Sequence, residues 1–271
     1  MFQLLIICGI GLFAFGLLTF GHPVLRKLGG LCVLAASFLA GYFITGQIWV
    51  GILFAGAWFF IPWVEILTRI RRMRLPLEKE LNHRRPPSRE LFPALPDFTE
   101  EVEMSDFVYV EDTGWQWGDI KQFVRIFYHD KRKIQATICL SEQAKAAFAY
   151  IALSSRTSDG HVWTTWNYPF APTMKFAPEL RVNRVTNAES FEELLLCHDA
   201  FLYSQGVTSP DLEEQDPNNF EALMQKEIRH QIDHNLDQGL IKLSGEGTFR
   251  YSWRGLFFLW CQFVKDMVRL S

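Results

Sequence analysis

The sequence predicts an α+β membrane protein, in which a bundle of transmembrane α-helices precedes a water-facing domain with an antiparallel sheet and C-terminal helices. Three observations lead to this fold class. Residues 1–68 are apolar and almost uncharged, residues 69–106 are first basic and then rich in proline, and residues 107–271 alternate between β-rich runs, turn residues and helical patterns. The first region therefore suits lipid, and the last suits water.

The apolar region is long enough for about three spans. Residues 2–20 carry no charge and can cross the ~30 Å hydrocarbon core of a bilayer. Residues 28–67 would measure about 60 Å as one helix, which is twice that thickness. We therefore expect two further spans, at about 29–46 and 48–68, with a tight turn near Gly46. The alternative is one kinked crossing, which gives two spans in all.

Basic residues at two places favour three spans. Arg26 and Lys27 lie in the first loop, and a second group follows the last span: Arg69, Arg71, Arg72 and Arg74. The positive-inside rule places both groups in the cytoplasm, and two spans between them return the chain to the same side. We expect a multi-pass protein of a bacterial inner membrane, with its N-terminus outside and its large domain in the cytoplasm.

Small residues recur four apart in the expected spans, at Ala36 and Ala40, Gly41 and Thr45, and Gly51 and Ala55. Such spacing lets helix backbones approach closely. The close contacts can lie within one chain or between two copies of it.

Residues 69–106 are expected to form a basic and then extended tether. The prolines are Pro76, Pro86, Pro87, Pro93 and Pro96, and prolines at this density interrupt helices and sheets. The whole chain has 27 basic and 30 acidic residues, of which six and one lie in residues 1–74. Residues 75–271 therefore carry 21 basic and 29 acidic residues, and no nucleic-acid partner is expected for an acidic domain.

The first half of the domain, residues 107–271, predicts a sheet of four or five antiparallel strands. Residues 122–128 and 133–140 are β-rich runs joined by a charged turn, and residues 149–156 and 161–167 flank Asp159-Gly160, a hairpin signal. Residues 181–186 are a further strand candidate. The Ala-rich residues 141–148 are expected to form a helical turn.

Helices are expected in the second half. Ser190 and Glu193 form a capping box for a helix that ends at Gly206, and residues 219–238 form a helix that ends at Gly239. A hairpin around residues 245–247 precedes a last helix at 253–270, which has a polar face and a wide aromatic face. That helix is expected either in the domain core or in the membrane interface.

Two resemblances concern this half of the chain. Residues 218–271, with the order helix, hairpin, helix, loosely resemble the end of a winged-helix domain, although the first helix is more acidic than a DNA-reading helix. The motifs Asp159-Gly160, Thr164-Thr165-Trp166-Asn167 and Glu193-Leu194-Leu195 with His198 resemble a group of uncharacterised bacterial membrane-anchored proteins. Trp166 departs from that pattern. This resemblance implies architecture and no activity.

Three groups of residues could form a site. His198 could act as a base oriented by Asp199, beside Thr165 and Asn167 at the expected end of a strand. His230 and His234, four apart on one helix with Glu227 a turn earlier, could hold a zinc ion. The strand end at 164–167 could also line a pocket or a peptide-binding face with Trp163, Trp115 and Trp117.

Each group also has a structural interpretation, which is the more common one for such side chains. A buried histidine explains the first group, a solvated helix face explains the second, and aromatic packing of a sheet on helices explains the third. No nucleotide-binding motif occurs, and no cofactor is expected.

These observations favour a non-enzymatic, membrane-anchored protein whose cytoplasmic domain binds a partner or organises the membrane surface. Its expected partners are the lipid bilayer and either another protein or a second copy through the transmembrane helices. One alternative is a membrane-associated, hydrolase-like enzyme, which requires His198 and Asn167 to meet in an open cleft. The other is a membrane-tethered regulator with a winged-helix-like module.

Overall fold

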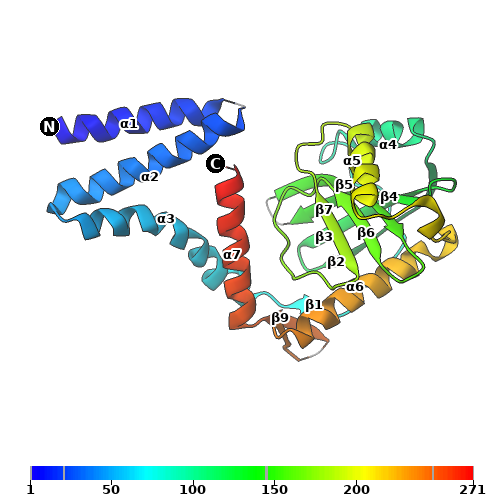
Figure 1. Ribbon diagram of the computed structural model, residues 1–271. Helices are drawn as coiled ribbons and strands as arrows, with labels where there is room; N and C mark the ends of the chain where they lie inside the picture. The colour runs from blue at the N-terminus through cyan, green and yellow to red at the C-terminus, as the bar shows by residue number, and fades with distance from the viewer. Residues whose placement is uncertain (1, 21, 144–145, 246, 271) are drawn as a thin grey trace. The chain divides into compact units, whose positions relative to one another are not determined.

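The computed structural model describes residues 2–20, 22–143, 146–245 and 247–270, and the chain forms two compact units (Figure 1). The helical unit holds the chain up to Met73, Ala171–Met174 and the chain from Arg250 onward. The sheet unit holds Arg74–Phe170 and Lys175–Phe249. The predicted fold class is confirmed: three apolar helices, each long enough to span a membrane, precede a domain with a mostly antiparallel sheet and helices.

The three apolar helices are α1 (Phe2–Thr19), α2 (Pro23–Thr45) and α3 (Ile48–Thr68). Gly46 ends α2 with φ 71°, and its N–H donates to the Tyr42 carbonyl, so the kinked single crossing is wrong. The expected start of the second span is also wrong. The His22 side chain caps α2 by accepting a hydrogen bond from the Val24 N–H at 3.3 Å, so α2 begins at Pro23 and contains Arg26 and Lys27 in its first turns.

Two glycines allow α2 and α3 to pack closely. A Cβ on Gly41 would lie 2.7 Å from the Val50 carbonyl oxygen, and one on Gly51 would lie 2.7 Å from the Phe38 ring and 2.8 Å from the Phe38 carbonyl oxygen. The small residues at these two positions therefore serve packing within one chain. A hydrogen bond from Trp58 Nε1 to Ser37 Oγ, 2.8 Å long, adds a polar link between the same helices.

The last helix, α7 (Trp253–Leu270), has the predicted bounds but belongs to the helical unit. The Trp260 Nε1–H donates to the Phe59 carbonyl of α3 at 2.7 Å, and the Trp260 and Trp63 rings stack with centroids 6.2 Å apart. Of the two sequence-based alternatives, packing of α7 into the core of the sheet domain is therefore wrong. The expected domain of residues 107–271 is therefore also wrong at its C-terminal end, because α7 belongs to the helical unit.

The sheet unit contains a six-stranded sheet in the order β2-β3-β4-β5-β6-β7. Its strands are β2 (Val108–Trp117), β3 (Ile120–His129), β4 (Ile134–Gln143), β5 (Ala146–Arg156), β6 (Val162–Trp166) and β7 (Leu180–Arg184). The predicted hairpins β3–β4 and β5–β6 are confirmed. Neighbours pair antiparallel except β6 and β7, which are parallel, and β2 has no counterpart in the prediction.

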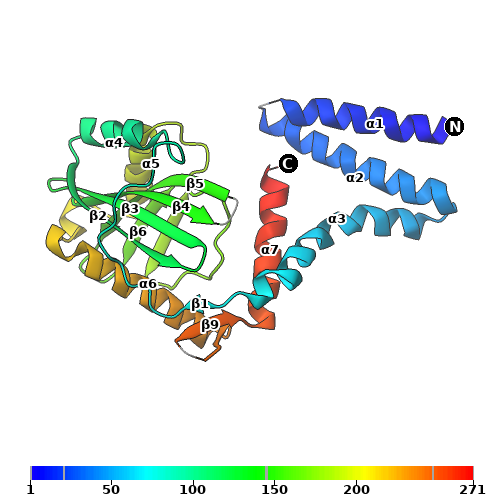
Figure 2. The same cartoon turned by 180° about the vertical axis from the view of Figure 1, so that it is seen from behind.

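Both faces of this sheet are covered by helices, as Figures 1 and 2 show. One face packs on α4 (Leu95–Met104) and α5 (Phe191–Ser204) through Phe123, Phe127, Ile138 and other buried side chains. The opposite face packs on α6 (Phe220–Asp237), where Phe220 contacts a cluster with Val124, Ile126, Tyr128 and Cys139. Burial on both sides explains the consecutive apolar side chains at 123–124 and 126–128 in β3 and at 138–140 in β4.

Two local predictions are wrong. Residues 141–148 do not form a helical turn: Ser141 and Phe148 are register partners in the β4–β5 pair, although Ala144 and Lys145 lie outside the described residues. Tertiary pairing there overrides the helix propensity of alanine.

The tether is not extended throughout, because residues 95–104 form α4, in which Val102 is fully buried.

Part of the expected tether instead covers the edge of the sheet. The backbones of Asn82 and Gly114 exchange two hydrogen bonds of 3.0 Å along β2. Gly114 has no room for a side chain, since a Cβ there would lie 2.1 Å from the Gln122 carbonyl oxygen. The proline-rich chain thus protects an edge strand from pairing with other chains.

The Ser190 N-cap and the glycine stops of the later helices are confirmed, but the capping box is formed only in half, because the Glu193 carboxylate accepts from the Glu189 N–H instead of the Ser190 N–H. The Ser190 hydroxyl accepts a hydrogen bond from the Glu193 N–H at 3.2 Å, and Gly206 and Gly239 follow α5 and α6 with positive φ. Strands β8 (Ile241–Leu243) and β9 (Thr248–Tyr251) form a small sheet with β1 (Leu75–Pro76) in the order β1-β9-β8. Within the turn predicted at residues 245–247, Glu246 lies outside the described residues.

Gly51→Ala should destabilise the helical unit, because the new methyl group would overlap Phe38 of α2. We expect a loss of about 1–3 kcal/mol in the free energy of unfolding, measured as a lower Tm of the detergent-solubilised protein. Gly56→Ala is the matched control, since a Cβ on Gly56 of the same helix would meet nothing within 4 Å beyond the adjoining helix backbone. Equal effects of the two substitutions would contradict close packing at Gly51.

Candidate functional site

His198 lies fully buried between two strands and α5. Its Nε2 is hydrogen-bonded to Ser155 Oγ and its Nδ1 to Thr165 Oγ1, each at 3.0 Å. All three side chains are inaccessible to solvent. Burial, with a further contribution from the positive charge of Arg132, lowers the pKa of His198 from its ordinary 6.5 to about 4. The imidazole is therefore neutral at pH 7 and holds α5 to the sheet.

The other members of the first candidate group do not join this cluster. Asp199 forms an ion pair with Arg132 and is partly exposed. Asn167 extends the β5–β6 pairing instead: its Oδ1 accepts a hydrogen bond from the Ile151 N–H at 2.7 Å. The structure thus brings His198 and Thr165 together in the core, and it places Asp199 and Asn167 with other partners.

The second candidate group is divided among separate contacts. His230 Nε2 lies 3.2 Å from Glu179 Oε2, while the Glu227 carboxylate binds Arg156. His234 Nε2 is buried with no hydrogen-bond partner. Among the described residues, no three His, Cys, Asp or Glu side chains gather closely enough to hold a metal ion.

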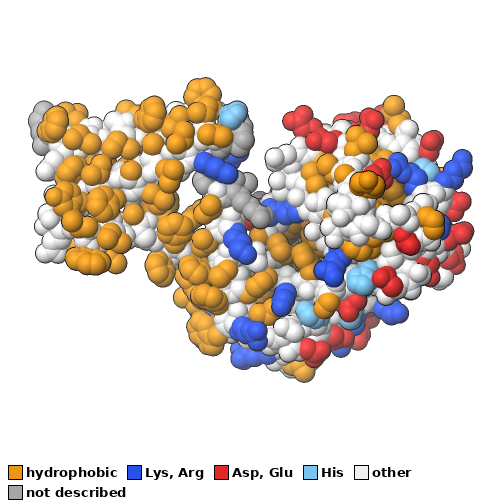
Figure 3. Space-filling model, in the orientation of Figure 1, with side chains coloured by type: hydrophobic (Ala, Val, Ile, Leu, Met, Phe, Trp, Pro, Cys, Tyr) orange, Lys and Arg blue, Asp and Glu red, His pale blue; other side chains and the backbone are white. Residues whose placement is uncertain are grey.

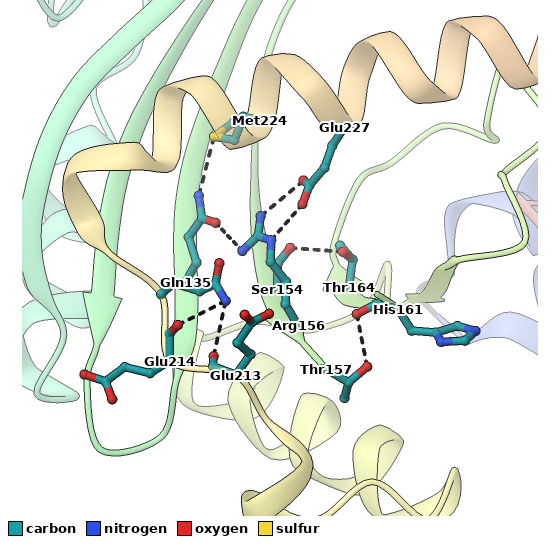
Figure 4. Close-up of polar contacts among 11 residues, drawn as sticks. Gln135, Ser154, Arg156, Thr157, His161, Thr164, Glu213, Glu214, Met224 and Glu227 are labelled. Atoms are coloured by element: carbon teal, nitrogen blue, oxygen red, sulfur yellow. Dashed lines mark hydrogen bonds and ion pairs between the residues drawn. The ribbon is translucent and has the colours of Figure 1, made fainter. Parts of the chain in front are cut away.

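Glu227 belongs to a polar network between the sheet and α6, which Figure 4 shows. The buried Arg156 guanidinium donates to both Glu227 oxygens, at 2.7 and 3.1 Å, and to Gln135 Oε1 at 2.8 Å. Gln135 Nε2 in turn lies 3.4 Å from the Met224 sulfur on α6. Bidentate pairing satisfies a cation that would otherwise be costly to bury, so this network fixes α6 on the sheet.

α6 also holds the crossover between β6 and β7. The fully buried Asn235 accepts a hydrogen bond from the Lys175 N–H at 3.0 Å and donates one to the Lys175 carbonyl at 2.9 Å. Gln231 Oε1 accepts another from the Ala177 N–H at 3.1 Å. The polar side of α6, on which the zinc candidate depended, thus serves to position this loop.

An aromatic cluster occupies one end of the face that α6 covers, and we call it the aromatic end of the sheet. Its members are Phe148, Tyr150, Trp166, Tyr168, Phe170 and Phe176. The Tyr150 and Tyr168 rings meet edge to face with centroids 4.9 Å apart, and Phe148 and Phe170 do so at 5.1 Å. Phe170 is 49% exposed and the other five are half-buried.

Polar groups connect to this cluster from neighbouring strands. Trp115 Nε1–H donates to Gln122 Oε1 at 2.6 Å, and Gln122 Nε2–H donates to the Tyr150 hydroxyl at 3.0 Å. The Lys79 ammonium lies 4.2 Å from the centroid of the Trp115 ring, and burial lowers the pKa of Lys79 to about 8. The Trp166 Nε1–H is buried with no hydrogen-bond partner. Rings with a few oriented polar groups are typical of ligand sites.

The three tryptophans that the sequence groups as pocket candidates are separated in the structure. Trp163 faces the α5 side with Leu202 and Leu212, whereas Trp115 connects to the aromatic end. The Trp117 Nε1–H donates to the Arg74 carbonyl at 2.9 Å. The third candidate group therefore does not form one pocket.

Sequence reasoning missed the contribution of Phe148 and Tyr150 to the aromatic end. Phe148 lies in the segment that predicts a helical turn, and Tyr150 lies in the next predicted strand, 149–156. The alternation Phe148, Tyr150, Ala152 along one strand face is the signal that could have revealed them.

The helical unit presents a second candidate surface, which suits lipid. Large apolar side chains point outward from all three helices, including Leu12, Phe15, Ile44, Leu53 and Phe60. In Figure 3, hydrophobic side chains cover much of the drawn face of α1–α3. Patches of this extent mark contact with a membrane or another protein.

The buried His198 should make stability depend on pH. Its folded-state pKa is lowered, so the unfolded chain binds the proton first: the stabilisation is complete above pH 6.5 and is lost as pH falls toward 4. We expect the free energy of unfolding to fall by on the order of 3 kcal/mol over this pH range. His198→Gln should have a lower free energy of unfolding than the wild type at pH 7. The variant lacks the pH-dependent contribution of His198, so the difference in free energy of unfolding between variant and wild type should shrink as pH falls to 4. A difference that stays constant between pH 7 and 4 would contradict a neutral, buried imidazole.

Comparison of the chain with protein-family models, with curated proteins and with solved structures finds no match. Function is therefore inferred from the residues and their geometry alone.

Proposed function

We propose that the chain is a multi-pass membrane protein whose cytoplasmic sheet unit binds a partner protein at the aromatic end of the sheet, without catalysing a reaction. The observation that carries this proposal is the cluster of six half-buried or exposed aromatic side chains on a sheet face that α6 otherwise covers. Aromatic side chains supply most of the binding energy at many protein interfaces. A partner that presents an apolar or aromatic side chain fits this surface.

The distribution of charge supports a cytoplasmic sheet unit. With three spans, the start of α2 and the end of α3 lie on the same side of the membrane, and they carry Arg26 and Lys27 and the four arginines between residues 69 and 74. The positive-inside rule assigns that side to the cytoplasm. The five cysteines are all free, as expected for a reducing compartment.

The state of the polar candidates favours binding over hydrolysis. A general base must reach a substrate proton, whereas His198 is enclosed by Ser155 and Thr165 and is inaccessible to solvent. The hydrolase-like alternative required His198 and Asn167 to share an open cleft, and Asn167 instead bonds to the backbone of β5. The proposal therefore assigns these residues structural roles.

The regulator alternative has weaker support. Charged side chains on α6 are used within the chain: Glu227 binds Arg156, and Arg229 binds Asp233 and Glu78. A DNA-reading helix needs basic side chains that are free to reach phosphates and base edges. The loose winged-helix resemblance and the resemblance to bacterial membrane-anchored proteins therefore remain proposals about architecture.

Reporter fusions test the orientation. A green fluorescent protein fused after Ser271 should fluoresce and an alkaline phosphatase at the same position should be inactive, because the C-terminus lies in the cytoplasm. Phosphatase fused after Gly46, between the second and third spans, should be active and is the matched control. Active phosphatase at Ser271 together with inactive phosphatase at Gly46 would reverse the proposed topology.

Phe170→Asp should abolish partner binding, because it places a charge among the rings of the aromatic end. We expect proteins that co-purify with the wild-type chain to fall at least tenfold in quantitative affinity capture from detergent-solubilised membranes. Tyr203→Ala is the control, since Tyr203 is an aromatic side chain of the same unit that is 85% exposed elsewhere, on α5. If both variants capture the same proteins as wild type, the aromatic end is not the binding surface.

A further inference from the structure

The helix α7 carries an apolar stripe with several exposed side chains. Trp253, Phe257, Cys261, Val264 and Val268 recur every three or four residues and therefore share one side of the helix. Trp253, Phe257 and Val268 are 60%, 55% and 54% exposed. Leu256 and Leu259, on the other side, are almost fully buried. α7 thus has a packed inner side, an apolar outer stripe and a third, polar side that includes Gln262 and Lys265.

Basic side chains border this stripe. Arg254 and Lys265 are exposed on α7 beside it. The Arg71 guanidinium, from the short 3-10 helix Ile70–Arg72, lies 4.6 Å from the centroid of the Trp253 ring. Tryptophan and arginine at the end of a transmembrane span are typical of the boundary between hydrocarbon and headgroups.

The position of α7 in its unit matches that boundary. It contacts α3 through Trp260, which reaches Phe59 and Trp63, and it also contacts α2. In Figure 1, α7 crosses the end of the bundle where α2 begins and α3 ends, and it does not run alongside α1. This is the end that bears Arg26, Lys27 and the arginines that follow α3. Among the described helices α7 is not a candidate span.

We propose that α7 is an in-plane membrane helix, which lies in the headgroup region on the basic side of the bundle with its apolar stripe in contact with the lipid of an anionic bilayer. This inference rests on the proposed membrane anchoring and extends it. The occupant of the stripe is lipid because α7 packs against α2 and α3, whose outward side chains are apolar, and because its bordering charges are positive.

The contacts within the unit fix the position of α7 along α3, and therefore its depth in the proposed bilayer. Pro62 of α3 has no backbone N–H, so the helix lacks one internal hydrogen bond at that turn. Trp260 donates to the Phe59 carbonyl in the same region, and its ring stacks on Trp63. Trp253, seven residues earlier on α7, meets Arg71 beyond the end of the span. The N-terminal half of α7 is therefore held beside the last turns of α3.

Photo-crosslinking to lipid tests the proposal on the full chain. A photoreactive amino acid replaces Phe257 on the stripe, Gln262 on the polar side of α7, or Leu12 on the exposed face of α1. The protein is reconstituted in nanodiscs of phosphatidylcholine with about 30% phosphatidylglycerol, a composition chosen as a generic anionic surface. We expect lipid adducts from positions 257 and 12, and at least tenfold fewer from position 262.

The possible failures are distinguishable. Adducts at position 12 without adducts at position 257 would overturn the in-plane helix and leave the membrane anchor intact. Crosslinks from position 257 to a second copy or to another protein would also overturn it. Loss of adducts at both positions would overturn the anchor and, with it, the in-plane helix.

A second variant tests the role of charge. Arg254→Gln with Lys265→Gln should lower the ratio of phosphatidylglycerol to phosphatidylcholine adducts at position 257 by at least threefold, because two positive charges that attract anionic headgroups are removed. Both side chains are exposed, so the fold should tolerate the change. An unchanged ratio would contradict recognition of anionic lipid.

Discussion

The hydrocarbon core of a bilayer offers no hydrogen-bond partner to a backbone N–H or C=O, and the proposed membrane anchoring of the helical unit depends on that constraint. Each apolar segment must satisfy its backbone internally and so becomes a helix. The turn at Gly46 and the cap by His22 set where those helices end. Because apolar side chains gain nothing by leaving lipid for one another, the helices are held together by close approach at Gly41 and Gly51 and by the Trp58–Ser37 hydrogen bond.

In the sheet unit, by contrast, the hydrophobic effect is the main stabilising force, because apolar side chains leave water when they are buried. The six-stranded sheet hides both faces, one under α4 and α5 and the other under α6. Two of its buried polar groups are fully paired: His198 with two hydroxyls, and Arg156 with Glu227 and Gln135. Polar side chains of this kind can be mistaken for catalytic residues in the sequence. In the structure, their hydrogen bonds hold α5 and α6 to the sheet.

The aromatic end of the sheet and the stripe of α7 differ from these packed regions in the same respect: each leaves large apolar side chains exposed or only half-buried. A single exposed side chain needs no explanation, but contiguous ones indicate a surface that is covered in the working protein. Their surroundings differ. Phe170 and its neighbours are beside oriented polar groups and suit a protein side chain, whereas Phe257 and Val268 are bordered by Arg254 and Lys265 and suit a headgroup layer.

Local chemistry in the sequence determined the elements whose signals lie within a few residues. The apolar lengths of the three spans, the Ser190–Glu193 cap, the stops at Gly206 and Gly239, and the Asp159-Gly160 hairpin were all predictable for this reason. Tertiary structure alone decided that the Ala-rich residues 141–148 join two strands, that β2 is a strand despite Glu111, Asp112 and Gly114, and that β7 runs parallel to β6. It also decided that α7 packs on α3 and that His198 is enclosed between strands. Those outcomes depend on pairing and burial between residues far apart in the chain, and local propensities of a few tenths of a kcal/mol per residue do not encode them.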